Sequence, residues 1–337
     1  MIWMGIESSC DETACAILQD DFPRPRILAN ELYSQIREHE IYGGVVPEIA
    51  ARAHLEKIAV IVRSALQKAN KTPKEIQAIA YTRGPGLMGP LLVGANFARG
   101  LARDLEIPAY GINHLEGHIA AAWLFAETLE APFLTLTVSG GHTELVVENP
   151  GFRYELLGRT RDDAAGEAFD KCGKLLGLGY PAGPLIGKLG KTGNRKFHHF
   201  PRALKNRDNG DFSFSGLKTS VLRYVESNTP EFIRENIHDI CASLEDAIVD
   251  TLVHKVIWAL KKTGLRNLVV GGGVSANARL RERLSHYCEP RGIGLHFPSP
   301  PLSTDNGAMI AAAAIRRARE QALLQNSEIK PWMPLAD

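Results

Sequence analysis

Short apolar runs alternate with longer amphipathic segments along this chain. Apolar residues dominate residues 2–7 and 14–18, which predicts two strands joined by the polar turn 8–13. Behind Pro47, apolar residues recur at helical spacing, which predicts a helix over residues 47–70. The other expected strands are 78–82, 107–112, 133–138, 144–147 and 267–270, and the other expected helices are 91–105, 164–176, 237–262 and 305–325. Because each half begins with a hairpin and continues into helices, we predict an α/β fold of two similar lobes with a ligand cleft between them.

Length and charge narrow the class of protein. At about 150 residues per domain, a chain of 337 residues predicts two domains. The 39 basic and 38 acidic side chains nearly cancel. This balance argues against a surface coated in positive charge, but it leaves room for a local patch that binds nucleic acid. The longest stretch without a charged residue, 84–98, contains glycine and proline and is shorter than the roughly 20 apolar residues of a membrane span.

The N-terminus and the cysteines predict a cytoplasmic protein with no membrane partner. Residues 1–7 contain no basic leader and no cleavage site. The five cysteines form no CxxC pair. An odd number of cysteines without a signal peptide fits reduced thiols in the cytosol.

Three turns have the composition of anion-binding loops. Residues 139–143 (SGGHT) lie between two expected strands, and residues 271–277 (GGGVSAN) lie between a strand and a helix. Glycines let the backbone approach a phosphate or an adenine closely, and small polar residues with free N–H groups in the turn 8–13 suit an anion too. Neither glycine turn matches a P-loop or a GxGxxG fingerprint. Tight packing of strand and turn is the alternative interpretation.

Two histidines four residues apart, His114 and His118, fall on one face of a helical turn and can share one metal ion. A third, oxygen ligand must come from elsewhere, and Asp305 at the start of the last expected helix is the best candidate. Two imidazoles and a carboxylate suit zinc or iron(II). The alternative is two unrelated helix histidines. A metalloprotease is disfavoured, because its HExxH motif needs Glu directly after the first His, whereas Glu116 is the second residue after His114.

Residues 162–171 place four carboxylates around the start of an expected helix. Asp162 and Asp163 fit a helix cap. Glu167 and Asp170 lie three apart on one face, where carboxylates can bind the hydroxyls of a ribose or an amine. The spacing does not choose between these interpretations.

A basic stretch follows in residues 187–207, which we expect to be mostly loop. Its cations are Lys188, Lys191, Arg195, Lys196, Arg202, Lys205 and Arg207, with Phe197, His198, His199 and Phe200 interleaved. Cations neutralise phosphates, and aromatic or imidazole rings stack on exposed bases. The stretch is therefore a candidate RNA-binding patch, and a solvated loop is the alternative.

The motifs occur together, in order, over nearly the whole chain. They comprise residues 5–13, 42–48, 84–87, 114–118, 139–143, 163–171, 212–219, 271–277 and 304–309. With these motifs the chain resembles the bacterial TsaD family (older names Gcp and YgjD), the tRNA adenosine threonylcarbamoyltransferases. It departs from the commonest pattern at Ser8, where many members have Thr, and at Ala182, where Gly is frequent.

The resemblance implies a fold and a reaction. The fold is that of the actin-like ATPases (ASKHA), with two ribonuclease-H-like lobes. Residues 1–130 would form the N-terminal lobe, completed by the C-terminal helix at about 308–337, and residues 131–307 the other lobe. The reaction would transfer the threonylcarbamoyl group from threonylcarbamoyl-adenylate to the exocyclic amine of adenosine 37, in tRNAs reading codons that begin with A, and release AMP.

The resemblance also implies site residues. His114, His118 and Asp305 would bind the metal, and magnesium would be an additional ion accompanying a bound nucleotide. The substrate-binding residues would be Thr137, Val138, Ser139, Gly140, Gly141, Asp170, Gly183 and Asn277. Residues 137–141 would hold phosphate near the metal, Asp170 the ribose hydroxyls, and Gly183 and Asn277 the rest of the nucleotide.

Because AMP is a good leaving group and an adenine amine is a poor nucleophile, the reaction needs an activated electrophile and positioning more than a strong base. We expect the metal to act as a Lewis acid and Asp11 or Glu12 to orient the amine or accept its proton. The expected partners are tRNA, the adenylate (or ATP and AMP), a TsaB-like paralogue bound through the N-terminal lobe, and a TsaE-like ATPase.

Three other functions compete with this one. An ATPase or kinase of the same fold usually has Asp-x-Gly in its opening hairpin, where this chain has Glu7-Ser8-Ser9. A metalloprotease is disfavoured by the place of Glu116. A non-catalytic platform within a tRNA-modifying complex is the third.

Overall fold

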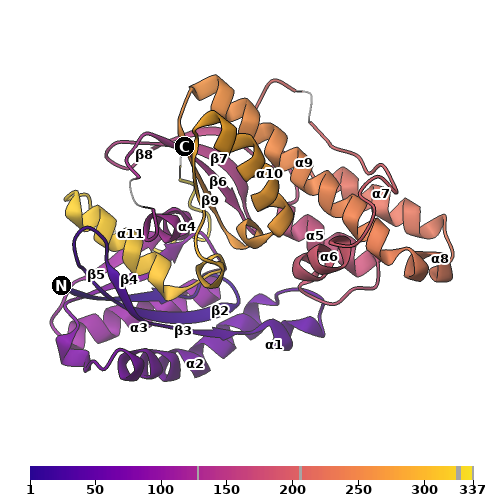
Figure 1. Ribbon diagram of the computed structural model, residues 1–337. Helices are drawn as coiled ribbons and strands as arrows, with labels where there is room; N and C mark the ends of the chain where they lie inside the picture. Colours follow the sequence, from indigo (N-terminus) through magenta and orange to yellow (C-terminus); the bar gives the residue numbers. More distant parts are fainter. Residues whose placement is uncertain (127–128, 205–206, 324–327, 336–337) are drawn as a thin grey trace. The chain divides into compact units, whose positions relative to one another are not determined.

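The computed structural model (Figure 1) describes residues 1–126, 129–204, 207–323 and 328–335. Contacts within it divide the chain into two compact units. The first unit comprises Met1–Thr128, Gly151–Arg153 and Pro298–Asp337, and the second comprises Leu129–Pro150 and Tyr154–Phe297. Each unit contains a five-stranded sheet.

The sheet of the first unit has the strand order β3-β2-β1-β4-β5. Its strands are β1 (Ile2–Glu7), β2 (Glu12–Gln19), β3 (Arg26–Ser34), β4 (Ala78–Gly84) and β5 (Ala109–Asn113). β1, β2 and β3 form an antiparallel meander, whereas β4 and β5 run parallel to β1. The parallel strands are joined through helices, as parallel pairs require.

Helices cover both faces of this sheet. Trp3 faces α4 (His114–Trp123) and α11 (Gly307–Arg319), whereas Met4 faces α2 (Pro47–Lys68) and α3 (Met88–Asp104). Figure 1 shows α11 on one side of the sheet and α2 and α3 on the other. Because β1 is buried on both faces, its sequence is a continuous apolar run rather than an alternating one.

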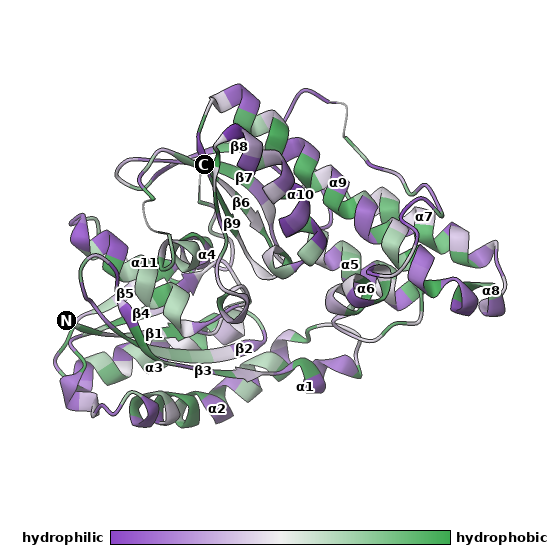
Figure 2. Cartoon of the chain, viewed as in Figure 1, coloured by the Kyte–Doolittle hydropathy of each residue, from purple (hydrophilic) through white to green (hydrophobic). Residues whose placement is uncertain are grey.

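The sheet of the second unit has the order β10-β9-β6-β7-β8. Its strands are β6 (Phe133–Val138), β7 (Thr143–Asn149), β8 (Arg153–Arg159), β9 (Asn267–Gly271) and β10 (Gly294–His296). Its helices are α5 (Ala165–Leu175), α6 (Ala182–Gly190), α7 (Ser215–Glu226), α8 (Pro230–Glu235), α9 (Ile237–Thr263) and α10 (Ala278–Cys288). In Figure 2, β6, β7 and β9 are mainly hydrophobic in colour and α10 is mainly hydrophilic. This contrast matches the core, which the apolar strands and α9 share with one face of α10.

The expected strands and the helices expected at 47–70, 91–105, 164–176 and 237–262 are confirmed, whereas residues 187–190 and the last helix differ from the prediction. Residues 187–190 end helix α6 and are not loop. The last helix begins at Gly307, behind the cap Asn306, whose Oδ1 accepts a hydrogen bond from the Met309 N–H (3.0 Å). That helix ends at Arg319, short of the expected residue 325, because Gln321 takes a left-handed conformation (φ 54°). None of the described helices is long and apolar enough to cross a membrane.

Candidate metal centre and nucleotide-binding turns

The two histidines of the predicted metal site are placed by the start of α4. This helix follows β5 directly, and Asn113 caps it by accepting a hydrogen bond from the Leu115 N–H (2.8 Å). His114 is its first residue, and His118 lies one turn later on the same face. The third residue, Asp305, lies two positions before α11. All three residues belong to the first unit.

The predicted triad comes together in space. Nε2 of His118 lies 3.3 Å from Oδ1 of Asp305, and Nε2 of His114 lies 3.6 Å from the same oxygen. One ligand atom from each residue falls within 4.8 Å of the others. The structure thus brings together three residues that span nearly two hundred positions of sequence.

The surroundings of the triad fit a metal ion. His118 is buried, its Nδ1 has no hydrogen-bond partner among the described residues, and its Nε2 has only the ion-pair contact with Asp305 (3.3 Å). A buried polar atom without a partner is costly, and coordination would satisfy one of the two nitrogens. Nδ1 of His114 lies 3.2 Å from Oε2 of Glu7 and 3.1 Å from Oγ of Ser9. These two contacts occupy Nδ1 and leave Nε2 of His114 as the ligand atom. Metal-binding histidines typically bind the metal through one ring nitrogen and a neighbouring polar group through the other.

Negative charge accumulates around these histidines. Burial by itself lowers the pKa of His114. The carboxylates of Asp305 and Glu7 outweigh burial and raise this pKa to about 9. Burial, together with Asp11 and Asp305, raises the pKa of Glu12 well above its usual range. Such crowding of carboxylates is relieved by a cation, so the electrostatics also fit a divalent metal.

One N–H group of the opening turn is already occupied by a carboxylate of the preceding strand. Its Ser9 N–H donates to Oε1 of Glu7 (2.6 Å), and the Thr82 hydroxyl donates to the other oxygen of Glu7 (2.5 Å). Asp11 is buried in the same turn. The N–H of Ser9 is therefore already bound to a carboxylate. Glu7 and Thr82 were not identified as site residues from the sequence. The signal that could have identified Glu7 is its place as an acidic residue at the end of a buried apolar strand.

In the second unit, the glycine turn 139–143 is held by its own serine. The Ser139 N–H donates to the His142 carbonyl (2.8 Å), and the His142 N–H donates to the Ser139 hydroxyl (3.1 Å). A Cβ added at Gly140 or Gly141 would meet nothing within 4 Å. These two glycines therefore keep open space beside the backbone. The preceding residues Thr137 and Val138 are buried at the end of β6.

The second glycine turn packs against the first. Gly272 has φ 88°, and a Cβ there would lie 2.4 Å from the Val138 carbonyl oxygen. Asn277 caps α10 through the Leu280 N–H (2.9 Å) and donates from Nδ2 to Oε1 of Glu245 (2.8 Å). The residue missed here is Glu245, a buried carboxylate on α9 that no local pattern marks.

The acidic segment serves mainly as caps. Asp170 accepts a hydrogen bond from the Ala182 N–H (2.7 Å) and so holds the start of α6, which contains Gly183. Asp162 accepts hydrogen bonds from the N–H groups of Phe214 and Ser215 (2.7 and 3.1 Å) at the start of α7. The prediction that Asp162 and Asp163 cap the helix that directly follows them is therefore wrong, because Asp162 binds the start of α7 and Asp163 pairs with Lys171 (2.7 Å).

The basic stretch is only partly available to a ligand. Phe200 is buried, and His198 packs against it with ring centroids 4.6 Å apart, so stacking of bases on Phe200 is excluded. Arg202 forms ion pairs with Asp246 (3.1 Å) and Asp250 (3.0 Å). Lys205 lies outside the described residues. The exposed cations that remain are Lys188, Lys191, Lys196 and Arg207.

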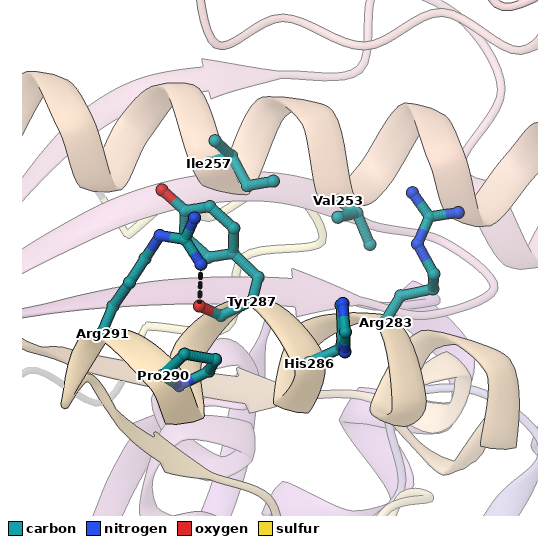
Figure 3. Close-up of a pocket in the computed structure, with 7 residues that line it drawn as sticks. All are labelled: Val253, Ile257, Arg283, His286, Tyr287, Pro290 and Arg291. Carbon is teal, nitrogen blue, oxygen red and sulfur yellow. Dashed lines mark hydrogen bonds between the residues drawn. The ribbon is translucent and has the colours of Figure 1, made fainter.

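A surface pocket of about 270 Å³ lies elsewhere, between α9 and α10 (Figure 3). Its lining residues are Val253, Ile257, Arg283, His286, Tyr287, Pro290 and Arg291. The Arg291 guanidinium lies 4.1 Å from the centre of the Tyr287 ring and donates to the Tyr287 carbonyl (2.9 Å). None of the predicted site residues lines this pocket, so it is separate from the candidate site.

Comparison with known proteins agrees with this fold. The chain superposes on HypF of T. kodakarensis with a TM-score of 0.62 and 14% identity, over 98% of this chain and 49% of that one. It superposes on component A of the Acidaminococcus fermentans (R)-2-hydroxyglutaryl-CoA dehydratase with a TM-score of 0.57 and 16% identity, over 95% and 99% of the two chains. The chain thus has the actin-like ATPase fold, as predicted.

Sequence comparison specifies the family. A family profile described as "TsaD: tRNA N6-adenosine threonylcarbamoyltransferase" matches residues 26–312. Proteins of that name from Variovorax paradoxus and Polaromonas naphthalenivorans are 47% and 49% identical to this chain. These matches cover 100% and 93% of this chain, and 97% and 88% of the relatives. The chain belongs to the TsaD family, and it is an enzyme that transfers a threonylcarbamoyl group in tRNA modification.

Proposed function

We propose that the chain takes its threonylcarbamoyl group from threonylcarbamoyl-adenylate and places it on the exocyclic amine of adenosine 37, in tRNAs that read codons beginning with A. The bond between the carbamoyl carbon and the phosphate oxygen breaks, and AMP leaves with its electron pair. A bond forms between that carbon and the amine nitrogen, which gives up one proton. The family to which the chain belongs supports this reaction.

We further propose that His114, His118 and Asp305 hold one divalent metal ion, iron(II) or zinc. The observation that carries this proposal is the convergence within 4.8 Å of one ligand atom from each of the three residues, two of which are buried histidines. When bound, such an ion supplies a Lewis acid for phosphate and carbamoyl oxygens. Glu7 and Ser9 orient the ring of His114 through Nδ1.

The proposed nucleotide contacts lie in the second unit. Backbone N–H groups of residues 139–141 hold phosphate oxygens, and the open space at Gly140 and Gly141 supports this role. Asp170 holds ribose hydroxyls, while Gly183 and Asn277 line the nucleotide. Magnesium accompanies the nucleotide in this proposal. The hydrogen bonds of Asp170 to α6 and of Asn277 to α10 fix both side chains in place.

Asp11 and Glu12 are the proposed groups that orient the amine or accept its proton. Asp11 lies in the turn between β1 and β2 and Glu12 is the first residue of β2, in the same unit as the histidine pair. The kinase alternative is disfavoured, because Glu7 occupies the place of the expected aspartate and already binds the Ser9 N–H and the Thr82 hydroxyl. The protease alternative is disfavoured too, because Glu116 is paired with Arg317 instead of being available to activate water.

The proposed partners are tRNA, a TsaB-like paralogue and a TsaE-like ATPase, in the cytoplasm. Support for a protein partner comes from α2 and α3, which lie side by side with Gly89 close to Ala51. Large apolar side chains are exposed on these two helices, namely Leu55, Val60, Met88 and Leu92. Exposed apolar side chains on neighbouring helices are typical of a protein interface.

Replacement of one ligand tests the metal proposal. We expect His114→Ala to lose bound metal and to slow transfer from supplied adenylate to tRNA by about 100-fold or more, because a Lewis acid contributes several kcal/mol to transition-state stabilisation. His286→Ala, at an exposed histidine on α10, is the matched control and keeps both properties. Metal content and transferred label are measured on the same preparations with partner proteins present.

Full transfer by His114→Ala would contradict the metal role. ATP turnover that needs neither tRNA nor threonine would instead favour the kinase. A reconstituted system in which adenylate is not consumed would favour the non-catalytic platform.

A further inference from the structure

The helix that carries both histidines also carries a buried ion pair. Glu116 lies between His114 and His118 on α4, and Arg317 lies near the end of α11. Nε of Arg317 donates to Oε2 of Glu116 (2.6 Å), and Nη2 of Arg317 donates to Oε1. Both residues are 8% exposed. This two-point geometry fixes orientation as well as distance.

The turn of α4 that contains this pair contacts α11 in three ways. His118 points to Asp305, just before α11 begins. Gly117 faces the side of α11, where an added Cβ would lie 3.0 Å from Ile310 and 3.1 Å from Met309. Glu116 reaches the far part of α11 at Arg317. The spacing of the three prospective ligands therefore depends on how α4 lies along α11.

Arg317 is itself held from several sides. Its Nη1 donates to the Ala322 carbonyl (3.0 Å), and its guanidinium lies 4.5 Å from the centre of the Phe152 ring. The anchor for Glu116 is therefore rigid. Apolar packing between the small residues of α4 and α11, such as Ala120 and Ala312, has no comparable directionality.

We propose that Glu116 and Arg317 form a positioning pair, which sets the register of α4 on α11 and thereby holds His114 and His118 at metal-binding distance from Asp305. This inference rests on the proposed metal site. Glu116 acts through the histidines and does not touch the substrate. The ion pair explains why an acidic residue lies between two metal ligands in an enzyme that needs no protease-type general base.

Cobalt(II) is the probe for the experiment, because its visible absorption reports ligand geometry as well as binding. Full-length protein freed of metal is titrated with Co²⁺. We expect Glu116→Gln to bind Co²⁺ about 10- to 100-fold more weakly than the unmodified protein, as is typical when residues behind metal ligands are changed. Its absorption bands should also shift. Arg317→Lys keeps the charge without the two-point geometry, and should give an intermediate affinity.

Two further variants separate positioning from general stability. Arg202→Gln breaks the partly buried ion pairs of Arg202 with Asp246 and Asp250 in the second unit and should leave Co²⁺ affinity and spectrum unchanged. The double variant Glu116→Met/Arg317→Met removes the pair without leaving a buried charge, so it should fold even if Glu116→Gln does not. We expect its Co²⁺ affinity to fall as well, despite an unfolding midpoint no lower than that of Arg202→Gln.

If either Glu116 variant binds Co²⁺ with the affinity and the spectrum of the unmodified protein, the positioning role is wrong. The metal site itself would not be affected by that result. Failure of the unmodified protein to bind Co²⁺, or retention of binding by His114→Ala, would overturn the metal site and the positioning role with it.

Discussion

His54 is a buried side chain held in one charge state. It lies on α2, with Nε2 3.0 Å from the Cys10 carbonyl and Nδ1 2.7 Å from the Thr13 hydroxyl. A carbonyl only accepts, so Nε2 carries the proton and Nδ1 accepts from Thr13. The neutral ring thus satisfies both contacts. Burial lowers the pKa of His54, although the Cys10 hydrogen bond and the nearby Glu7 and Asp11 oppose that shift.

The lowered pKa of His54 predicts a pH dependence of stability. Since the folded-state pKa lies below the unfolded value of about 6.5, the contribution of His54 is present above pH 6.5 and is lost as the pH falls toward the folded-state pKa. Between pH 7.5 and 5, we expect the free energy of unfolding to fall more steeply for the unmodified protein than for His54→Gln. Urea unfolding at several pH values measures this difference. His286→Gln is the control and should keep the original slope, whereas equal slopes for all three proteins would refute the prediction.

At the scale of elements, two glycines bring α11 directly onto β1 and β2. A Cβ at Gly5 would lie 2.2 Å from the Gly307 carbonyl oxygen, and one at Gly307 would lie 2.4 Å from the Ala16 nitrogen. The backbone of the helix therefore touches the backbone of the sheet. Because Asp305 immediately precedes this contact, the same packing places the third prospective ligand.

This packing predicts that Gly5→Ala is strongly destabilising. The added methyl group meets backbone atoms that cannot move aside, so we expect the free energy of unfolding to fall by about 3 kcal/mol or more. Gly100→Ala is the matched control, because Gly100 lies in α3 with nothing within 4 Å of an added Cβ. It should be neutral or stabilising by up to about 1 kcal/mol. Chemical denaturation compares the two, and equal effects would show that the close approach of α11 is not required.

At the scale of the whole molecule, charge is balanced overall but uneven locally. The net charge is +1, yet Lys188, Lys191 and Lys196 are exposed within one short segment of the second unit. Arg202 belongs to the same segment of sequence but is neutralised by Asp246 and Asp250. The candidate tRNA patch is therefore smaller than its composition indicates.

Reversal of these three lysines to glutamate tests the patch. We expect weaker tRNA binding, with a logarithmic salt slope shallower by about 2 to 3, because each phosphate contact contributes about 0.7 to 0.9 to that slope. Binding of the adenylate should be unchanged. Reversal of Arg63, Lys74 and Arg103, exposed in the first unit, makes the same change in net charge and should preserve the slope. If both triple variants behave alike, net charge alone explains tRNA binding.

The local sequence determined a large part of this protein. The α/β class follows from short apolar runs between amphipathic segments, and the helical face shared by His114 and His118 follows from their spacing of four. The family followed from motifs kept in order along the chain. These features can be predicted from the sequence because strand alternation, helical spacing and helix caps depend on residues only a few positions apart.

Only the tertiary structure decided what each side chain meets. Glu116 finds Arg317 across 201 positions, and Glu7 reaches His114 across 107. Phe200 is removed from the RNA-binding candidates because it is buried in the core. No local sequence pattern predicts these contacts, since they depend on how whole helices pack against sheets. The spacing of four residues thus determined that His114 and His118 share one helix face. The packing of α11 on β1 and α4 decided that Asp305 lies beside them.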